Sequence, residues 1–358
     1  MTTLFEATRA YERWLRQELD TVERRDLALK HKLMAEAPFH FMRATFYRWV
    51  PVWHEVCAEL AQAPRVLAVG DLHVENFGTW RDAESRLVWG VNDVDEAAPM
   101  PYAIDLVRLA TSALLARREQ HLAIAPKAAC KAILEGYRKQ LRDGGRAFVL
   151  EEDHPALREA ALSVERDPEH YWKRMDALRS VNAPPKVRKM LAAHLPNPRA
   201  RFRIGHRIAG LGSLGRPRYV ALARWEGANL AREAKAMLPS AFGWALGRPS
   251  ERLHCSAIIA RAVRCHDPCF AFTGRWLVRR LGPHCSRIEL WMLPKKRDER
   301  HLLEAMGRET ANLHLGSGAS ASAACADLAR RPKGWLLAAA TRMADATITD
   351  WKAWKARR

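Results

Sequence analysis

A polar loop that follows an apolar run constrains this chain more than any other feature of its sequence. The run reads Arg-Val-Leu-Ala-Val over residues 65–69, and the loop reads Gly-Asp-Leu-His-Val-Glu-Asn over residues 70–76. A short apolar run of this kind predicts a buried strand. The end of that strand would deliver Asp71 to the loop, and Asn76 would follow it with the spacing Asp-x-x-x-x-Asn.

A predicted hairpin comes directly after this loop. Residues 77–80 and 87–91 have the composition of two strands, and a polar turn joins them. Such a hairpin returns the chain so that Asp93 faces Asn76, with Asp95 close behind it. The sequence therefore predicts that carboxylates and a carboxamide meet in one place.

This set of groups is what phosphoryl transfer from a magnesium nucleotide requires. Asp71 would orient the attacking hydroxyl and accept its proton. Asn76 and Asp93 would hold Mg²⁺, with Asp95 as a further ligand. Kinase catalytic loops have the same Asp-to-Asn spacing. A single Asp-x-x-x-x-Asn also occurs in turns, where both residues bend loops or cap helices, but several pieces in the expected order favour the site.

The motifs at residues 70–76, 92–97 and 105–110 resemble the signature series of aminoglycoside and choline phosphotransferases, which are kinase-like enzymes that phosphorylate small hydroxylated molecules. The chain resembles more closely a bacterial family known as domain of unknown function 2252, through the same blocks together with residues 37–43 and 235–240. This resemblance extends over roughly residues 30–315. It implies a two-lobe, kinase-like α+β fold that binds ATP and Mg²⁺.

Two further residues would have supporting roles, and the resemblance implies the role of Asp105. His73 would be structural, packing under the loop or bonding a carbonyl, rather than chemical. Asp105 would brace the catalytic loop from the start of a helix that we expect at residues 106–118. Asp105 could also be the N-cap of that helix, and the two roles are compatible.

A glycine-rich loop at residues 210–215 reads Gly-Leu-Gly-Ser-Leu-Gly. The same spacing marks dinucleotide-binding folds, but there the third glycine opens a helix. Here predicted strands at 201–204 and 218–225 flank the loop, as in kinases, where backbone N–H groups cover the phosphates. The residues expected to hold ATP are Gly210, Gly212, Ser213, Gly215 and Lys235.

The partner of Lys235 is not evident from the sequence. Kinases pair this lysine with a glutamate on the next helix. We expect Glu251, at the start of a predicted helix that runs to about residue 263, with Glu233 as the alternative. The resembling family usually has Glu directly after the lysine, whereas this chain has Ala236.

The order of the parts predicts a circularly permuted kinase fold. In ordinary kinases the glycine loop precedes the catalytic Asp, but here it follows. Residues 276–281 and 287–291 read as the last strands and the linker between lobes, and a helix at about 297–313 resembles the one that normally leads into the catalytic loop. Both chain ends would lie where that helix meets the catalytic strand. The alternative is a coincidental glycine loop in an unrelated second domain.

The predicted domains follow from this order. Residues 1–197 would form a helical large lobe, residues 198–294 a small β-rich nucleotide lobe, and residues 295–358 helices that return to the large lobe. Prolines at 184–185 and 196–198 mark the first boundary. Amphipathic helices are expected at residues 4–19, 25–35, 102–118, 125–141 and 171–178.

The composition gives the chain a strong positive charge. Its 358 residues include 59 Lys and Arg but only 40 Asp and Glu, so the formal net charge is +19. Such a surface attracts anions, and the tryptophans in the basic tail 351–358 could stack on bases. No nucleic-acid module is recognisable, so nucleic acid is the weaker expectation. No apolar run is long enough to span a membrane. Scattered cysteines without a CxxC pair and the absence of a signal segment predict a cytoplasmic protein with reduced thiols.

Three functions are consistent with these features. The first is an active ATP-dependent phosphotransferase that acts on a hydroxyl of a small molecule. The second is a kinase-like nucleotide-binding regulator that has lost transfer activity. The third is a metal-dependent phosphoesterase, because Gly-Asp-Leu-His also resembles the first motif of that class, although its further metal ligands are missing. The acceptor is not identified by the sequence.

Overall fold

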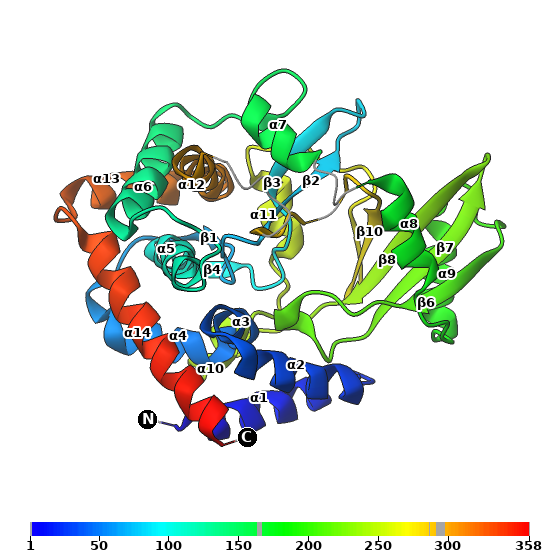
Figure 1. The fold of residues 1–358 in the computed structure, drawn as a ribbon, viewed down its shortest axis with the longest axis horizontal. Coiled ribbons are helices and arrows are strands. Elements are labelled where there is room, and N and C mark those ends of the chain that lie inside the picture. The colour runs from blue at the N-terminus through cyan, green and yellow to red at the C-terminus, as the bar shows by residue number, and fades with distance from the viewer. Residues whose placement is uncertain (1, 163–166, 286, 291–297, 358) are drawn as a thin grey trace.

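The computed structural model describes residues 2–162, 167–285, 287–290 and 298–357, and it consists of two regions (Figure 1). Helices gather on one side of the molecule, and an antiparallel sheet forms the other side. The predicted α+β class is confirmed. Among the described residues, every helix is too short or too polar to cross a lipid bilayer.

The helical region is built from both ends of the chain. Its helices include α1 (Leu4–Glu18), α2 (Arg24–Glu36), α3 (Pro38–Ala44), α4 (Phe46–Val56), α5 (Ala103–Arg118), α6 (Pro126–Arg142), α7 (Pro155–Ala161), α12 (Glu299–Leu315), α13 (Ala319–Arg330) and α14 (Trp335–Ala356). Helices α6 and α12 approach very closely. A Cβ on Gly136 would lie 2.0 Å from the carbonyl oxygen of Glu304, and one on Gly307 would lie 2.1 Å from that of Ile133. Only glycine fits at these two positions.

The sheet of the second region has the strand order β6 (Phe202–His206), β7 (Arg218–Trp225), β8 (Ala228–Ala236), β10 (Trp276–Leu281) and β9 (Ala271–Thr273). Helices α8 (Pro168–Asp176) and α9 (Pro185–Ala193) pack on it. Tyr171 of α8 shares an apolar cluster with Val220, whereas Val187 of α9 shares another with Tyr219. Successive strand residues point to opposite faces, so the two helices cover opposite faces of β7.

The packing does not follow the predicted boundary between residues 197 and 198. Helices α8 and α9 precede this boundary but belong with the sheet. Helices α10 (Ala241–Ala245) and α11 (Cys255–Arg261) follow it but contribute to the core of the helical region. An amphipathic pattern shows that a helix buries one side, but it does not say against which surface. The predicted boundary between residues 294 and 295 lies outside the described residues.

The predicted strand, loop and hairpin near residue 70 are present. Strand β1 (Arg65–Ala68) pairs with β4 (Ala98–Pro101). Strands β2 (Phe77–Arg81) and β3 (Leu87–Val91) form the hairpin, with Phe77 opposite Val91, and β5 (Phe148–Val149) pairs with β3. The N–H of Asn92 donates to the carbonyl oxygen of Asn76 at 2.8 Å. The hairpin therefore returns the chain to the end of the loop.

Two predicted elements differ from the structure. Residues 287–290 do not form a strand of the sheet, since β9 already pairs with the edge of β10 that β8 leaves open. Instead the N–H of Ile288 donates to Phe77 at 2.9 Å, and Arg287 makes an isolated bridge with Gly78. Residue 291, the end of that predicted strand, lies outside the described residues. The helix expected from residue 250 is shorter and is limited to α11.

The two termini lie side by side, at the lower left of Figure 1. Phe5 stacks on Trp354 with ring centroids 5.6 Å apart, and Arg48 binds both Asp350 and the carbonyl of Thr2. The end of α12 does meet strand β1, because Oγ of Ser317, just beyond α12, accepts the N–H of Leu67 at 2.8 Å. The termini, however, meet at the other end of α14, so the predicted position of the chain ends is wrong.

We expect Asp105→Ala to lower the free energy of unfolding by roughly 3 kcal/mol or more, because buried donors would lose their acceptor at about 1–3 kcal/mol each. Asp105 is fully buried and accepts the N–H groups of Val69 and Gly70. Urea unfolding measures the change. Asp345→Ala, which removes an exposed ion pair with Arg118, serves as control and should cost about 1 kcal/mol or less. Equal losses would contradict the bracing role of Asp105.

Candidate active site

The loop that carries Asp71 is held by Asp105, in the first turn of α5. The carboxylate of Asp105 accepts the N–H of Val69 at 2.7 Å and that of Gly70 at 2.8 Å. His314, near the end of α12, lies with Nε2 3.0 Å from the same carboxylate. Because α5 begins before Asp105, this residue is not the N-cap. It braces the loop from the helix start, as the resemblance implies.

The two oxygens of Asp71 have different surroundings. Oδ1 accepts hydrogen bonds from Nε and Nη2 of Arg108 at 3.0 and 2.5 Å. Oδ2 faces the glycine loop, where a Cβ on Gly212 would lie 3.2 Å away. Arg108 is fully buried, so this bond fixes the orientation of the Asp71 carboxylate. The second oxygen, Oδ2, faces a cavity that Asp71 lines together with Asn76, Asp93 and Asp95.

Asn76 holds the loop and the hairpin together. Its Nδ2 donates to the carbonyl oxygens of Asp71 at 3.1 Å and Asp93 at 2.8 Å. Its Oδ1 accepts the N–H of Asp93 at 2.9 Å. The structure therefore places Asn76 between the two acidic residues, with one lone pair of Oδ1 already used.

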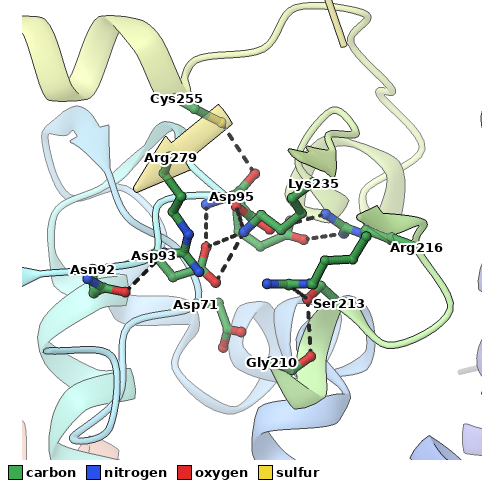
Figure 2. A network of polar contacts seen from close by, with 12 residues as sticks. Asp71, Asn92, Asp93, Asp95, Gly210, Ser213, Arg216, Lys235, Cys255 and Arg279 are labelled. Atoms are coloured by element: carbon green, nitrogen blue, oxygen red, sulfur yellow. Dashed lines mark hydrogen bonds and ion pairs between the residues drawn. The ribbon is translucent and has the colours of Figure 1, made fainter. Parts of the chain in front are cut away.

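Lys235 on β8 lies between the acidic residues that follow β3 (Figure 2). Its Nζ is 3.3 and 3.4 Å from the carboxylate oxygens of Asp93 and 2.5 Å from Oδ1 of Asp95. The lysine side chain is only 1% exposed. A positive charge from the sheet is thus buried against two negative charges from the helical region.

The two carboxylates do not titrate alike. Burial and the neighbouring charge of Asp93 raise the pKa of Asp95 to about 6. Burial acts in the same direction on Asp93, but Lys235 and Arg279 overcome it and hold the pKa of Asp93 well below its usual value. Two carboxylates that share one ammonium behave in this way, because they cannot both ionise with equal ease.

His73 lies under the loop in a structural position. Its Nδ1 accepts the N–H of Glu75 at 3.2 Å, and its ring packs edge-on to Phe39. Burial, together with Arg43 and Arg287, holds the pKa of His73 well below its ordinary value. With its pKa held low, His73 supports the loop as a neutral imidazole whose Nδ1 is an acceptor.

The glycine loop connects β6 to β7 and folds down over Asp71. The N–H and Oγ of Ser213 both donate to the carbonyl of Gly210, and the carbonyl of Gly215 accepts the N–H of Glu23. Lys30, which is buried, donates from Nζ to the carbonyl of Gly212 at 3.0 Å. Residues 210–215 are therefore packed against the N-terminal helices.

The prediction that Glu251 pairs with Lys235 is wrong. Glu251 is exposed, and the ion-pair partners of Lys235 are Asp93 and Asp95. Glu233, the alternative, is fully buried but binds Arg207, Arg218 and Arg279 instead. The reason is that Glu251 lies in an irregular segment before α11, outside the sheet face that carries Lys235.

A cleft of about 790 Å³ opens between the sheet and the helical region. This volume is within the usual range for ligand sites. Among the described residues, its walls carry Arg43, Arg174, Arg207, Arg218, Arg279 and Arg287. Asp93, Gly210 and Leu211 line both the cleft and the smaller cavity beside Asp71. The two hollows are therefore adjacent parts of one site.

Side chains near the N-terminus and in the C-terminal tail contact different parts of the molecule. His40 and Arg43 line the cleft, whereas Arg48 binds Asp350 near the termini. The tail tryptophans are engaged inside the molecule, because the indole of Trp351 donates to Ala35 and that of Trp354 to His31. They are not free to stack on bases.

The acidic residues fit a magnesium ion in part. Mg²⁺ is commonly bound through one or two carboxylates together with substrate phosphates. Asp93 lines the cleft, and Oδ2 of the buried Asp95 lacks a hydrogen-bond partner in the described residues, although Nη1 of Arg216 lies 3.6 Å away. Asn76 can contribute only the remaining lone pair of Oδ1. Among the described residues, no three His, Cys, Asp or Glu side chains converge into a metal site of their own.

Sequence reasoning gave no role to several basic residues at the site. Arg108 fixes Asp71, Arg216 binds Glu96, and Lys30 holds the glycine loop. Arg108 could have been found, because it lies three residues after Asp105 and so shares its helix face. Arg216 and Lys30 had no such signal, since their partners are distant in the chain.

Residues 23–194 match the model of a family described as an uncharacterized protein conserved in bacteria (DUF2252). The match supports the predicted family resemblance. It includes Asp71, Asn76, Asp93 and Asp95 and ends before the glycine loop and Lys235. No curated protein and no solved structure matches the chain.

We expect the stability conferred by Lys30 to depend on pH. Burial lowers the pKa of Lys30 to about 8, whereas in the unfolded chain it is about 10.4. The cost of burying the ammonium is fully present below pH 8 and disappears toward pH 10. Urea unfolding should therefore show that, from pH 7 to 10, the free energy of unfolding of the wild type rises relative to that of Lys30→Met. The rise should be at most ~1.4 kcal/mol per pH unit. A difference that does not change with pH would refute this.

Proposed function

We propose that this protein is a magnesium-dependent phosphotransferase that moves a phosphoryl group from ATP to a hydroxyl of a small molecule. The observation that carries the proposal is the contact of Lys235 with Asp93 and Asp95, beside a glycine loop that lies over Asp71. Lys235 and Asp93 are 142 residues apart in the chain. Kinase chemistry uses a lysine, a metal-binding Asp and a catalytic Asp in this way.

The topology of the sheet supports the same proposal. The glycine loop joins the first two strands, β6 and β7, and Lys235 lies on the third, β8, which is followed by helices α10 and α11. A glycine loop, then a lysine on the third strand, then a helix is the order of the kinase nucleotide lobe. We accordingly propose a kinase-like two-lobe fold.

The proposed circular permutation has its support at the junction of α12 and β1. His314 near the end of α12 bonds Asp105, and Ser317 just beyond it bonds β1. Joining these two elements directly would lead from the sheet through α12 into the loop of Asp71, which is the ordinary kinase order. In this chain α12 is followed by α13 and α14, which run toward the C-terminus, and β1 is preceded by the N-terminal helices α1–α4.

Each residue has a role under this proposal. Asp71 would accept the hydroxyl proton at Oδ2, since Arg108 holds Oδ1. Asp93 and Asp95, with Asn76, would hold Mg²⁺, which when bound neutralises charge on the phosphates. Lys235 and the loop that includes Gly210, Gly212, Ser213 and Gly215 would position the phosphates of ATP.

A second function is favoured by two observations. Gly212 lies against Oδ2 of Asp71, and among the described residues Lys235 has no glutamate partner of the kinase type. A kinase-like regulator that binds a nucleotide without transferring phosphate would tolerate both. The phosphoesterase alternative has less support, because it requires a larger set of metal ligands around Asp71.

We expect Asp71→Asn to lower phosphate transfer from labelled ATP by about 10²-fold or more, the usual contribution of a general base. ATP affinity, measured by calorimetry, should remain nearly unchanged. Asp93→Asn should instead weaken the part of ATP affinity that depends on Mg²⁺. Asp345→Asn, far from the cleft, is the control for both.

Three results would count against the proposal. ATP binding without turnover across a broad panel of hydroxyl acceptors would favour the regulator. Hydrolysis of a generic phosphoester with Mn²⁺ and no nucleotide would favour the phosphoesterase. Full activity of Asp71→Asn would remove the proposed base.

A further inference from the structure

The register of the sheet gathers charged residues on the face that looks into the cleft. Arg218 on β7 lies opposite Lys235 on β8. Arg279 on β10 lies opposite Glu233, which is two positions before Lys235 on β8. Residues at alternate positions of a strand share a face, so these four side chains project from the same side of the sheet.

Glu233 organises the arginines of this face. Its Oε1 accepts Nη1 of Arg207 at 2.7 Å and Nη1 of Arg218 at 3.0 Å, and its Oε2 accepts Nε of Arg279 at 2.8 Å. The carboxylate is fully buried. Burial alone would raise the pKa of Glu233, but the three guanidinium groups overcome it and hold that pKa well below its usual value. Glu233 is therefore a fixed negative centre for this arginine cluster, which consists of Arg207, Arg218 and Arg279.

The arginine cluster carries more positive charge than Glu233 can neutralise. One carboxylate serves three guanidinium groups, whose side chains are 23%, 5% and 14% exposed. Burial and repulsion from the other two arginines lower the pKa of Arg218 in spite of Glu233. Buried cations are costly unless they are paired. Lys235 does not change this excess of positive charge in the arginine cluster, because its own positive charge is neutralised by Asp93 and Asp95.

The arginine cluster presents free donors to the cleft. All its members line the cleft wall. Arg218 also donates to Oγ of Ser213 in the glycine loop at 2.9 Å. Arg279 donates to Oδ1 of Asn92 at 3.1 Å (Figure 2). Within the described residues, Nη2 of Arg207 and Nη2 of Arg279 have no protein acceptor. The cluster thus joins the glycine loop to the hairpin that bears Asp93 and still has hydrogen-bond capacity.

We propose that Arg207, Arg218 and Arg279, held in place by Glu233, bind the polyphosphate chain of a nucleoside triphosphate, with Lys235 at the inner end of the site. The proposal rests on the function proposed above and names the groups that would bind its nucleotide. Guanidinium groups suit this ligand because their planar forks bind phosphate oxygens in pairs and remain charged when buried. Glu233 would be a positioning residue, since it touches the arginines and not the ligand.

The charge of the whole cleft agrees with a polyanionic ligand. Among the described residues that line it, six arginines face the acidic residues Glu75, Asp93 and Glu289. A cleft lined mainly by one sign of charge concentrates ligands of the opposite sign. An uncharged ligand would not neutralise this excess of positive charge.

The test measures binding of Mg²⁺-ATP, inorganic tripolyphosphate and adenosine to the full chain by calorimetry. Arg207→Gln and Arg279→Gln should each weaken binding of ATP and of tripolyphosphate by about tenfold or more, about 1.4 kcal/mol of binding free energy. Adenosine binding should not change. Arg207→Lys and Arg279→Lys, which keep the charge but lose the fork, should recover part of the loss.

Two arginines of the same sheet provide matched controls. Arg280 follows Arg279 on β10 but points to the opposite face, where it binds Asp267. Arg224 lies on β7 like Arg218 but at the far end of the strand, exposed to solvent. Arg280→Gln and Arg224→Gln should change ATP affinity by no more than about twofold. Should Arg279→Gln fail to fold, the more exposed Arg207 carries the test.

The outcomes separate this inference from the proposed function. Unchanged ATP affinity in both Gln variants, with transfer still abolished by Asp71→Asn, would overturn the inference and leave the phosphotransferase standing. The Gln variants could lose tripolyphosphate binding while the wild type transfers no phosphate. That result would support the inference and contradict the proposed phosphotransferase function. Tripolyphosphate that binds the arginine cluster without competing with ATP would show that the cluster serves another phosphate ligand, which would also overturn the assignment.

Discussion

The arrangement of the site depends on the ion pairs between Lys235 and the carboxylates of Asp93 and Asp95. They join the sheet to the helical region at the point where the cleft and the cavity beside Asp71 meet. Removing such charges from water costs about as much as their attraction returns. We therefore infer that these ion pairs fix the distance between the sheet and the acidic hairpin, and that they add little to the free energy of unfolding.

Arginines surround this central contact and pair with most of the acidic groups near it. Arg108 binds Asp71, Arg216 binds Glu96, and Arg43 binds Glu75. These arginines are almost completely buried. Part of the arginine content of the chain is thus inside the fold, where guanidinium groups remain charged and orient carboxylates through paired hydrogen bonds. These arginines have a structural use at the site, because each of them pairs with one of its acidic groups.

The elements near residue 70 could be predicted because local sequence determines them. An apolar run that ends in glycine, and two strands joined by a polar turn, need no distant contact to be recognised. The glycine loop and the strand that follows it were predictable for the same reason. Asp105 could be placed as a brace because the family resemblance implies that role, although the bond from His314 was not evident.

Long-range partners could not be predicted in the same way. Glu251 was expected beside Lys235 on the basis of the kinase pattern, but the choice between Glu251, Glu233 and the aspartates depends on which strands pair and in which register. The register puts Arg279 opposite Glu233, which commits that carboxylate to arginines. Similarly, α8 and α9 were expected as part of the helical lobe, since their apolar sides do not reveal that a sheet covers them.

The position of the glycine loop is set by both ends of the chain. Leu211 and Leu214 are buried in one cluster with Leu4 of α1, Met34 of α2 and Trp354 of α14. Exposing a leucine to water costs on the order of 1.5–3 kcal/mol, so lifting this loop from Asp71 requires either a compensating ligand or movement of the terminal helices with it. In a kinase of ordinary order the glycine loop lies near one end of the chain. Here the N-terminal and C-terminal helices close around it, so a ligand that lifts the loop would act against the packing that joins the two termini.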